Sequence, residues 1–362
     1  SGDTGKAALE GFADVPNTKI LVFYPVDGVS PMQKLQMTTQ EGDNVSVCAI
    51  EGNFDDAQSG VKKIFTDKDI EKKFKENGLA FSSANSINWG RLVPQIVYYV
   101  SAYCDMIANG ELKTGEEMNV VVPTGNFGNI LAAYYAKRMG VPVKTLICAS
   151  NANNVLTDFL TSGIYDKNRA FYCTTSPSMD ILISSNLERL LYMVSNGNAE
   201  LVSGYMAELK ENGIYKVNDE IKTKISDSFA GGCADDEKCS ETIKETYDKF
   251  SYVTDTHTAV AYKVYEDYVR ETGDKTPTVI ASTASAYKFA ESVAKAVGLD
   301  ENKVKVLAKA GEKVTGFDYV KALSMETGVK VQVGLKDLEQ KPVIHNNVCE
   351  INEMPKVVIE AL

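Results

Sequence analysis

A glycine-containing segment between an apolar run and a helical pattern is the clearest candidate for chemistry in this sequence. Residues 123–129 read Pro-Thr-Gly-Asn-Phe-Gly-Asn and follow the apolar run 120–122. A loop that joins a buried strand to a helix directs backbone N–H groups and the positive end of the helix dipole at one point, which favours a phosphate. Gly125 and Gly128 would let the anion approach the backbone closely. The spacing fits neither the dinucleotide fingerprint nor the P-loop, and a tight turn with incidental glycines remains the alternative.

Two further helix starts carry hydrogen-bond donors for an anion. Residues 1–5 read Ser-Gly-Asp-Thr-Gly, and residues 82–88 read Ser-Ser-Ala-Asn-Ser-Ile-Asn, with Arg91 following on the same predicted helix. Hydroxyl, backbone N–H and guanidinium groups in such places suit a carboxylate or a second phosphate, although N-caps use the same residue types. Three donor-rich helix starts therefore predict an anionic small-molecule ligand.

Thr283 follows the apolar run 279–282, which reads as a buried strand. Its hydroxyl could cap the next helix or hydrogen-bond a ligand nitrogen. Considered by itself, this residue type in this position favours the cap.

Composition excludes several classes of function. Lys and Arg number 38 against 49 Asp and Glu, and the net charge of -11 would repel a polyphosphate backbone, so we expect no nucleic-acid partner. No run approaches the roughly 18 uncharged apolar residues of a membrane span. Two histidines and seven scattered cysteines match no metal-ligand spacing, so we expect no metal. This cysteine usage favours a reducing compartment and hence the cytoplasm.

The order of predicted elements indicates an α/β protein with two domains. Apolar runs typical of buried strands alternate with helical patterns, which favours parallel sheets with crossover connections. A chain of 362 residues is about twice the usual domain length. We expect a smaller domain at 1–110 and a larger one at 111–362. A long helix is predicted over 87–107, and Pro94 should kink it or mark its true start.

Several segments, in their order, resemble threonine synthase, a fold-type-II pyridoxal-phosphate enzyme, in the form found in bacteria and yeast. The matching blocks are Ser-Gly-Asp-Thr-Gly at 1–5, Glu-Gly-Asn-Phe-Asp-Asp at 51–56, Asn-Ser-Ile-Asn at 85–88, Thr-Gly-Asn-Phe-Gly-Asn at 124–129, Ser-Met-Asp at 178–180 and Asp-Thr-His-Thr-Ala-Val-Ala at 255–261. The resemblance covers residues 1 to about 290 and is weakly diagnostic beyond them. It implies the tryptophan synthase β-like architecture of two parallel-sheet α/β domains.

The resemblance also implies a reaction, the conversion of O-phospho-L-homoserine and water to L-threonine and phosphate by elimination and hydration with pyridoxal 5'-phosphate. The resemblance implies that the cofactor phosphate is bound by Gly125, Asn126, Phe127, Gly128 and Asn129, that Thr283 faces the pyridine nitrogen, and that Asp3 approaches the ring hydroxyl. It implies that the substrate carboxylate is bound by Ser1, Gly2 and Thr4, and the substrate phosphate by Asn85, Ser86 and Arg91. Asp3 stands where related enzymes often carry Asn. The resemblance makes no prediction of oligomeric state.

One departure from the family concerns the lysine that forms a Schiff base with the cofactor. In the family this lysine lies in a Phe-Lys-Asp segment upstream of the block at 1–5, and this chain begins at Ser1. Lys6, Lys263 and Lys288 lie in helical patterns and are poor substitutes. We therefore expect a fragment that is inactive by itself. The alternatives are a noncatalytic module that binds pyridoxal phosphate or phosphohomoserine, and another fold-type-II lyase.

Overall fold

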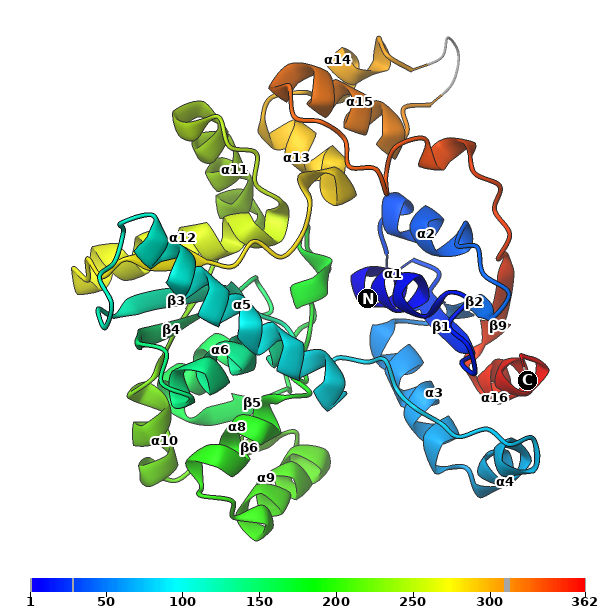
Figure 1. Cartoon of the computed structure of the whole chain (residues 1–362), viewed down its shortest axis with the longest axis horizontal. Helices are drawn as coiled ribbons and strands as arrows, with labels where there is room; N and C mark the ends of the chain where they lie inside the picture. Colours follow the sequence, from blue (N-terminus) through cyan, green and yellow to red (C-terminus); the bar gives the residue numbers. More distant parts are fainter. Residues whose placement is uncertain (1, 28, 309–312, 362) are drawn as a thin grey trace. The chain divides into compact units, whose positions relative to one another are not determined.

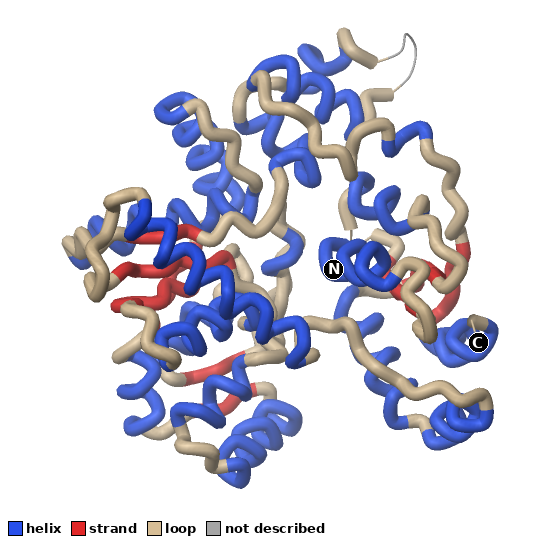
Figure 2. The backbone as a smooth tube through the Cα atoms, viewed as in Figure 1, coloured by secondary structure: helices blue, strands red, loops and turns tan. Residues whose placement is uncertain are grey.

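The computed structural model describes residues 2–27, 29–308 and 313–361, and they form two compact units (Figure 1). The first unit comprises residues 1–85, 287–291 and 300–362. The second comprises residues 86–286 and 292–299. Each unit contains its own parallel sheet, drawn in red in Figure 2, and the predicted α/β class is confirmed.

The sheet of the first unit has the order β1–β2–β9 in the described residues, and all its pairings are parallel. Its strands are β1 (Ile20–Pro25), β2 (Val45–Glu51) and β9 (Asn347–Glu350). Alternate residues of β2 belong to two different hydrophobic clusters, Val45 and Val47 to one and Cys48 and Ile50 to the other. Both faces of this sheet are therefore covered, as is usual for parallel sheets.

The helices of the first unit are α1 (Gly2–Phe12), α2 (Pro31–Thr38), α3 (Phe54–Thr66), α4 (Lys68–Glu76), α14 (Glu301–Lys305), α15 (Gly316–Thr327) and α16 (Met354–Glu360), with short 3-10 turns at Leu338–Gln340 and Ile351–Glu353. We predicted that the donor-bearing segment 1–5 lies just ahead of a helix, but residues 2–5 form the first turn of α1. The helix therefore begins within that segment and not after it.

The sheet of the second unit has the order β7–β4–β3–β8 and is also parallel in the described residues. Its strands are β3 (Met118–Pro123), β4 (Val143–Ser150), β7 (Phe229–Cys233) and β8 (Thr278–Ile280), and a separate antiparallel pair is formed by β5 (Ile164–Asp166) and β6 (Ile214–Lys216). Every residue of β3 is buried.

The strand predicted at 279–282 corresponds to β8, which ends at Ile280, two residues earlier than predicted. Thr283 therefore lies in the loop that follows β8.

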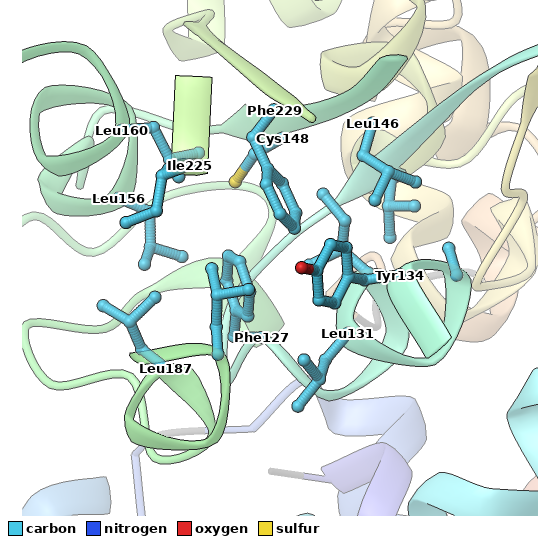
Figure 3. Close-up of a cluster of buried hydrophobic side chains, with 14 of the residues drawn as sticks. Phe127, Leu131, Tyr134, Leu146, Cys148, Leu156, Leu160, Leu187, Ile225 and Phe229 are labelled. Carbon is cyan, nitrogen blue, oxygen red and sulfur yellow. The ribbon is translucent and has the colours of Figure 1, made fainter. Parts of the chain in front are cut away.

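The helices of the second unit are α5 (Trp89–Ala108), α6 (Gly128–Arg138), α7 (Val155–Ser162), α8 (Leu187–Val194), α9 (Ala199–Asn212), α10 (Asp219–Ser226), α11 (Asp236–Phe250) and α12 (Thr256–Thr272), with a 3-10 turn at Pro177–Met179. The segments Ala286–Phe289, a 3-10 turn, and α13 (Ala290–Ala296) contribute residues to both units. Figure 3 shows part of the second unit's hydrophobic core, in which Phe127 and Phe229 lie among leucines from several elements. Pro94 lies inside α5, so it does not mark the start of that helix.

The division between the units differs from the predicted boundary at residue 110. Helix α5 belongs to the second unit because Leu92, Tyr99 and Tyr103 are buried in that unit's core. Residues 300–362 return to the first unit because β9 pairs with β2, with Ile50 opposite Cys349. A pairing across some three hundred residues leaves no local trace, so composition and periodicity could not reveal it.

Two exclusions concern the described part of the chain. None of its helices combines the length and the apolar character that crossing a bilayer requires. Its His, Cys, Asp and Glu side chains form no group of three that could hold a metal ion.

Candidate functional site

The glycine loop, residues 124–127, joins the carboxyl end of β3 to the start of α6 as the sequence predicted. Phe127 adopts a left-handed backbone conformation with φ of 61° directly before α6. This conformation is unfavourable for a residue with a side chain. Burial offsets that strain, because the Phe127 ring is 1% exposed and packs 5.8 Å from the ring of Phe229 (Figure 3). The turn is therefore anchored from inside the unit.

The carbonyl groups of the glycine loop are held on one side by residues 184–186. Ser184 Oγ donates to the carbonyl oxygen of Gly125 at 3.1 Å, and the carbonyl oxygen of Asn126 accepts from the backbone N and Nδ2 of Asn186 at 3.2 and 2.9 Å. The described residues contain no cis peptide bond. In a trans peptide unit the N–H points opposite to the C=O. The N–H groups of Asn126 and Phe127 therefore point away from residues 184–186.

These N–H groups form a site suited to an anion. No described residue accepts a hydrogen bond from the backbone N–H of Asn126 or Phe127. Both groups lie at the N-terminus of the eleven-residue helix α6, where the helix dipole adds positive potential. Consecutive unpaired N–H groups in this setting are a recurring binding site for phosphate.

Gly125 fits this loop because no side chain would. A Cβ added there would lie 2.5 Å from the carbonyl oxygen of Ser178, which is a backbone atom. The Ser178 N–H donates to Nε2 of His257 at 3.2 Å, and Nδ1 of His257 lies 3.2 Å from a carboxylate oxygen of Asp255. These contacts assign the proton to Nδ1, so that Nε2 can accept. Blocks 178–180 and 255–261 thus support the glycine loop from behind.

The carboxylate of Asp255 is the buried end of this chain of contacts. It caps α12 by accepting from the N–H groups of His257 and Thr258 at 2.8 and 3.3 Å. Burial by itself raises the pKa of Asp255, but the hydrogen bonds from His257 and Thr258 outweigh it and hold that pKa below its usual value of 3.8. The ionised form is therefore favoured in the folded protein.

We expect Asp255→Asn to destabilise the protein at pH 7 by about 1–2 kcal/mol, because the amide oxygen can still cap α12 but the negative charge that faces His257 and Thr258 is lost. The lowered pKa means that the stabilisation is complete above the usual value near 3.8 and is lost as the pH falls through the lower folded value. The gap between parent and variant should therefore narrow below about pH 4. Urea unfolding at pH 7 and at pH 3 measures the difference in free energy of unfolding between parent and variant at each pH.

Thr242→Val is the matched control, because it removes a buried hydrogen bond, from Thr242 Oγ1 to the Lys238 carbonyl, without touching a carboxylate. Its effect should be the same at both pH values. An Asp255→Asn gap that is constant or grows in acid would contradict the role given to the ionised carboxylate.

Thr283 lies at the same edge of the sheet as the glycine loop. Strand β8 pairs with β3, with Ile280 opposite Val121, and the carboxyl ends of parallel strands meet at one edge. Thr283 is exposed, and the next helical turn begins at Ala286. Thr283 therefore does not cap that turn, and the alternative favoured by its residue type was wrong.

Of the predicted substrate-phosphate residues, Ser86 and Arg91 belong to the second unit and Asn85 belongs to the first. The Ser86 carbonyl accepts from Nδ2 of Asn186 at 3.2 Å, and a Cβ added at Gly128 would lie 4.0 Å from that carbonyl. Ser86 is therefore close to the amino end of α6. Arg91 lies in the first turn of α5, and burial lowers the pKa of its guanidinium.

Asn129, predicted as a cofactor residue, has its side-chain oxygen hydrogen-bonded by the phenol of Tyr99. Burial raises the pKa of Tyr99, so the phenol stays protonated and donates. This bond leaves the Asn129 amide NH₂ group as its remaining side-chain donor. Tyr99 lies in the long helix predicted over 87–107, and the sequence alone assigned it no role at the site.

The predicted residues of the amino-terminal block belong to α1 where they are described. Ser1 lies outside the described residues, and Gly2 is the first residue of α1. Thr4 is partly buried on α1, and the carboxylate of Asp3 forms an ion pair with Lys288. The expected approach of Asp3 to a ring hydroxyl thus competes with an existing cationic partner.

All three lysines considered as possible substitutes for the Schiff-base lysine form ion pairs. Lys6 contacts Glu10 at 2.6 Å, Lys263 contacts Asp267 at 2.8 Å, and Lys288 contacts Asp3. In each of the first two pairs the partners are four residues apart on the same helix, α1 for Lys6 and α12 for Lys263, as the helical patterns predicted.

Sequence reasoning missed the segment 184–189. It contains Ser184 and Asn186, which hold the glycine loop, and Arg189, which donates to the carbonyl of Ile87 at 2.7 Å. This segment matches no motif, and its polar residues are common in loops. Only its place beside the glycine loop reveals its role.

This chain is similar to known proteins in both sequence and structure. The family described as "Threonine synthase, C-terminal" matches residues 258–327. Human "Threonine synthase-like 1" is 42% identical over 309 residues, which are 83% of this chain and 41% of that protein. Threonine synthase of Saccharomyces cerevisiae is 39% identical over 307 residues, 81% of this chain and 58% of that protein. The chain thus spans about half the length of these curated relatives.

The structure of pyridoxal-phosphate-bound threonine synthase from Brucella melitensis superposes with a TM-score of 0.79 at 36% identity. The match covers 99% of this chain and 68% of that one. It confirms the predicted fold-type-II architecture.

Proposed function

This chain belongs to the threonine synthase family, and we propose that it serves the conversion of O-phospho-L-homoserine and water to L-threonine and phosphate. The proposed cofactor is pyridoxal 5'-phosphate. The observation that carries the proposal is the glycine loop, whose N–H groups at the start of α6 and whose lack of space for a side chain at Gly125 fit a phosphate group. We also propose a cytoplasmic location, supported by the seven cysteines, all of which are free thiols.

The described residues supply distinct parts of a cofactor site. Residues 125–129 would hold the cofactor phosphate through backbone N–H groups and the Asn129 amide, and Thr283 would face the pyridine nitrogen. When bound, the cofactor supplies an electron sink for carbanionic charge. A neutral hydroxyl at Thr283, in place of a carboxylate, would leave the pyridine nitrogen largely unprotonated and so moderate that sink.

The substrate would be held by its two anionic groups. We assign its phosphate to Asn85, Ser86 and Arg91, and its carboxylate to the donors of residues 1–4. Arg91 would stabilise the charge that accumulates on the phosphate as it leaves, because a guanidinium pairs well with a phosphate through two parallel hydrogen bonds. Binding without turnover is the second candidate function, favoured by the ion pairs of Lys6, Lys263 and Lys288.

We expect inorganic phosphate and pyridoxal phosphate, each at millimolar concentration, to raise the melting temperature of this chain. A ligand that binds only the folded form stabilises it by mass action, by about 2.7 kcal/mol at one hundred times its dissociation constant. Scanning calorimetry with sulfate-free buffer measures the shift, and pyridoxal without phosphate is the control ligand. No shift with either phosphate, in a folded sample, would contradict the proposed cofactor site.

Turnover separates the two candidate functions. Phosphate release from phosphohomoserine is measured with the protein expressed from its complete reading frame. Release supports the enzyme, whereas pyridoxal-phosphate binding without release supports the binding module.

A further inference from the structure

We propose that Asn186 is a positioning residue that couples the glycine loop to the Ser86 segment, residues 86–91. The inference rests on the proposed function, in which the loop holds the cofactor phosphate and the segment contributes to the substrate-phosphate site. The Asn186 side chain is fully buried. Its Nδ2 donates to the carbonyl of Asn126 at 2.9 Å and to the carbonyl of Ser86 at 3.2 Å. One amide group therefore joins two backbone segments that are forty residues apart.

The orientation of the Asn186 amide is set by Arg189. The guanidinium of Arg189 donates to Oδ1 of Asn186, and it also donates to the carbonyl of Ile87 at 2.7 Å. A guanidinium can only donate, so the atom that it contacts is the amide oxygen and the NH₂ group faces the two carbonyls. Asn186 and Arg189 together thus bind two consecutive carbonyls of the Ser86 segment.

These contacts link the two proposed anion sites physically. The Asn126 carbonyl belongs to the same peptide unit as the Phe127 N–H, so fixing the carbonyl fixes the direction of a proposed phosphate donor. The Ser86 carbonyl is fixed by the other hydrogen of the same NH₂ group. An anion that orders the loop should therefore order the Ser86 segment, and the effect should be reciprocal.

The chain carries a natural reporter for this coupling. Trp89 is the only tryptophan in the sequence and belongs to the Ser86 segment. Its ring lies 6.0 Å from the guanidinium carbon of Arg189. Its fluorescence should respond when the segment or the guanidinium shifts.

The test is a titration with inorganic phosphate, which does not absorb at the wavelengths of tryptophan emission. Isothermal calorimetry measures binding, and Trp89 fluorescence measures the response of the Ser86 segment. For the parent we expect both to give the same dissociation constant. For Asn186→Leu, which is similar in size but has no donors, we expect about tenfold weaker binding, the effect of about one lost net hydrogen bond, and no Trp89 response.

Asn119→Leu is the matched control. Asn119 is similarly buried in the same unit, lies near the start of β3, and makes two side-chain hydrogen bonds, to Asp274 at 3.0 Å and from the Thr145 N–H at 3.2 Å. The substitution should lower the melting temperature while leaving phosphate affinity and the Trp89 response as in the parent. If Asn186→Leu does not fold, Arg189→Gln is the second variant, and we expect it to bind phosphate within a few-fold of the parent without the Trp89 response.

The outcomes separate this inference from the proposed function. A parent that binds no phosphate would overturn both. A parent that binds phosphate, with an Asn186→Leu variant of equal affinity and equal Trp89 response, would overturn the inference and leave the proposed function standing. Weaker binding with an unchanged Trp89 response would also overturn the coupling. If only the Arg189→Gln variant folds, a Trp89 fluorescence response to phosphate in that variant would likewise overturn the coupling.

Discussion

Gly125→Ala is expected to reduce the affinity for pyridoxal phosphate by more than about 100-fold, because one methyl group forces the loop out of its binding geometry. The new Cβ would lie 2.5 Å from the Ser178 carbonyl oxygen. Ser178 cannot easily retreat, since its N–H is bonded to the buried ring of His257. We also expect a loss of stability of about 1–3 kcal/mol from the overpacking. Equilibrium titration with pyridoxal phosphate and thermal unfolding measure the two effects.

Gly204→Ala is the control for this substitution. Gly204 lies inside α9 of the same unit, and a methyl group there meets no atom within 4 Å. The same chemical change should stabilise the protein by up to about 1 kcal/mol, because alanine is the better helix former, and leave the affinity unchanged. Pyridoxal phosphate that binds Gly125→Ala as tightly as the parent would remove the glycine loop from the cofactor site.

Arg91→Ala is expected to lower kcat/KM for phosphohomoserine by about 100-fold in the protein expressed from the complete reading frame. A charge-assisted contact to phosphate is worth about 1.5–3 kcal/mol, and partial burial of Arg91 places it in the upper part of that range. Pyridoxal-phosphate affinity should change little, because the proposed partner of Arg91 is the substrate. Arg91→Lys should restore the rate only in part, since a point charge cannot reproduce the planar fork. Steady-state kinetics and cofactor titration give the two readouts.

Arg138→Ala provides the control. Arg138 is exposed in the last turn of α6, so it tests the loss of one positive charge from the same unit. Its kinetics should equal those of the parent. Arg91→Ala kinetics that match those of Arg138→Ala would exclude Arg91 from the substrate site.

Local patterns were enough to predict the elements that carry the candidate site. The apolar run of β3, the two glycines and the helical pattern of α6 are contiguous, so the strand, loop and helix followed from residues 118–138 alone. The donor-rich start of α5 was predicted in the same way, although the helix begins at Trp89, two residues later than predicted, with Asn88 as its N-cap. Parallel sheets followed from the alternation of strands with helices. Each of these features depends on neighbours within a few turns of chain.

Where a polar group had a choice of partners, the sequence was a poorer guide. Thr283 looked like a cap, and the end of β8 two residues earlier than predicted left it exposed in a loop at the sheet edge. Asp3 looked like a ligand residue in a loop, and the structure places it on α1 beside Lys288. A hydroxyl or carboxylate accepts any suitable donor, so its residue type alone does not select one.

By itself, the sequence determined that this protein has two parallel-sheet units and a phosphate-suited loop at the end of a buried strand. Only the tertiary structure decided what holds that loop: Ser178 and the His257 ring behind Gly125, and Asn186 on the carbonyl of Asn126. It also decided that α5 belongs to the second unit and that β9 completes the first sheet. The physical reason is the range of the interactions. Hydrophobic periodicity and turn chemistry act between residues close in sequence, whereas these contacts join residues from about fifty to three hundred positions apart, and the packing of the whole chain selects them.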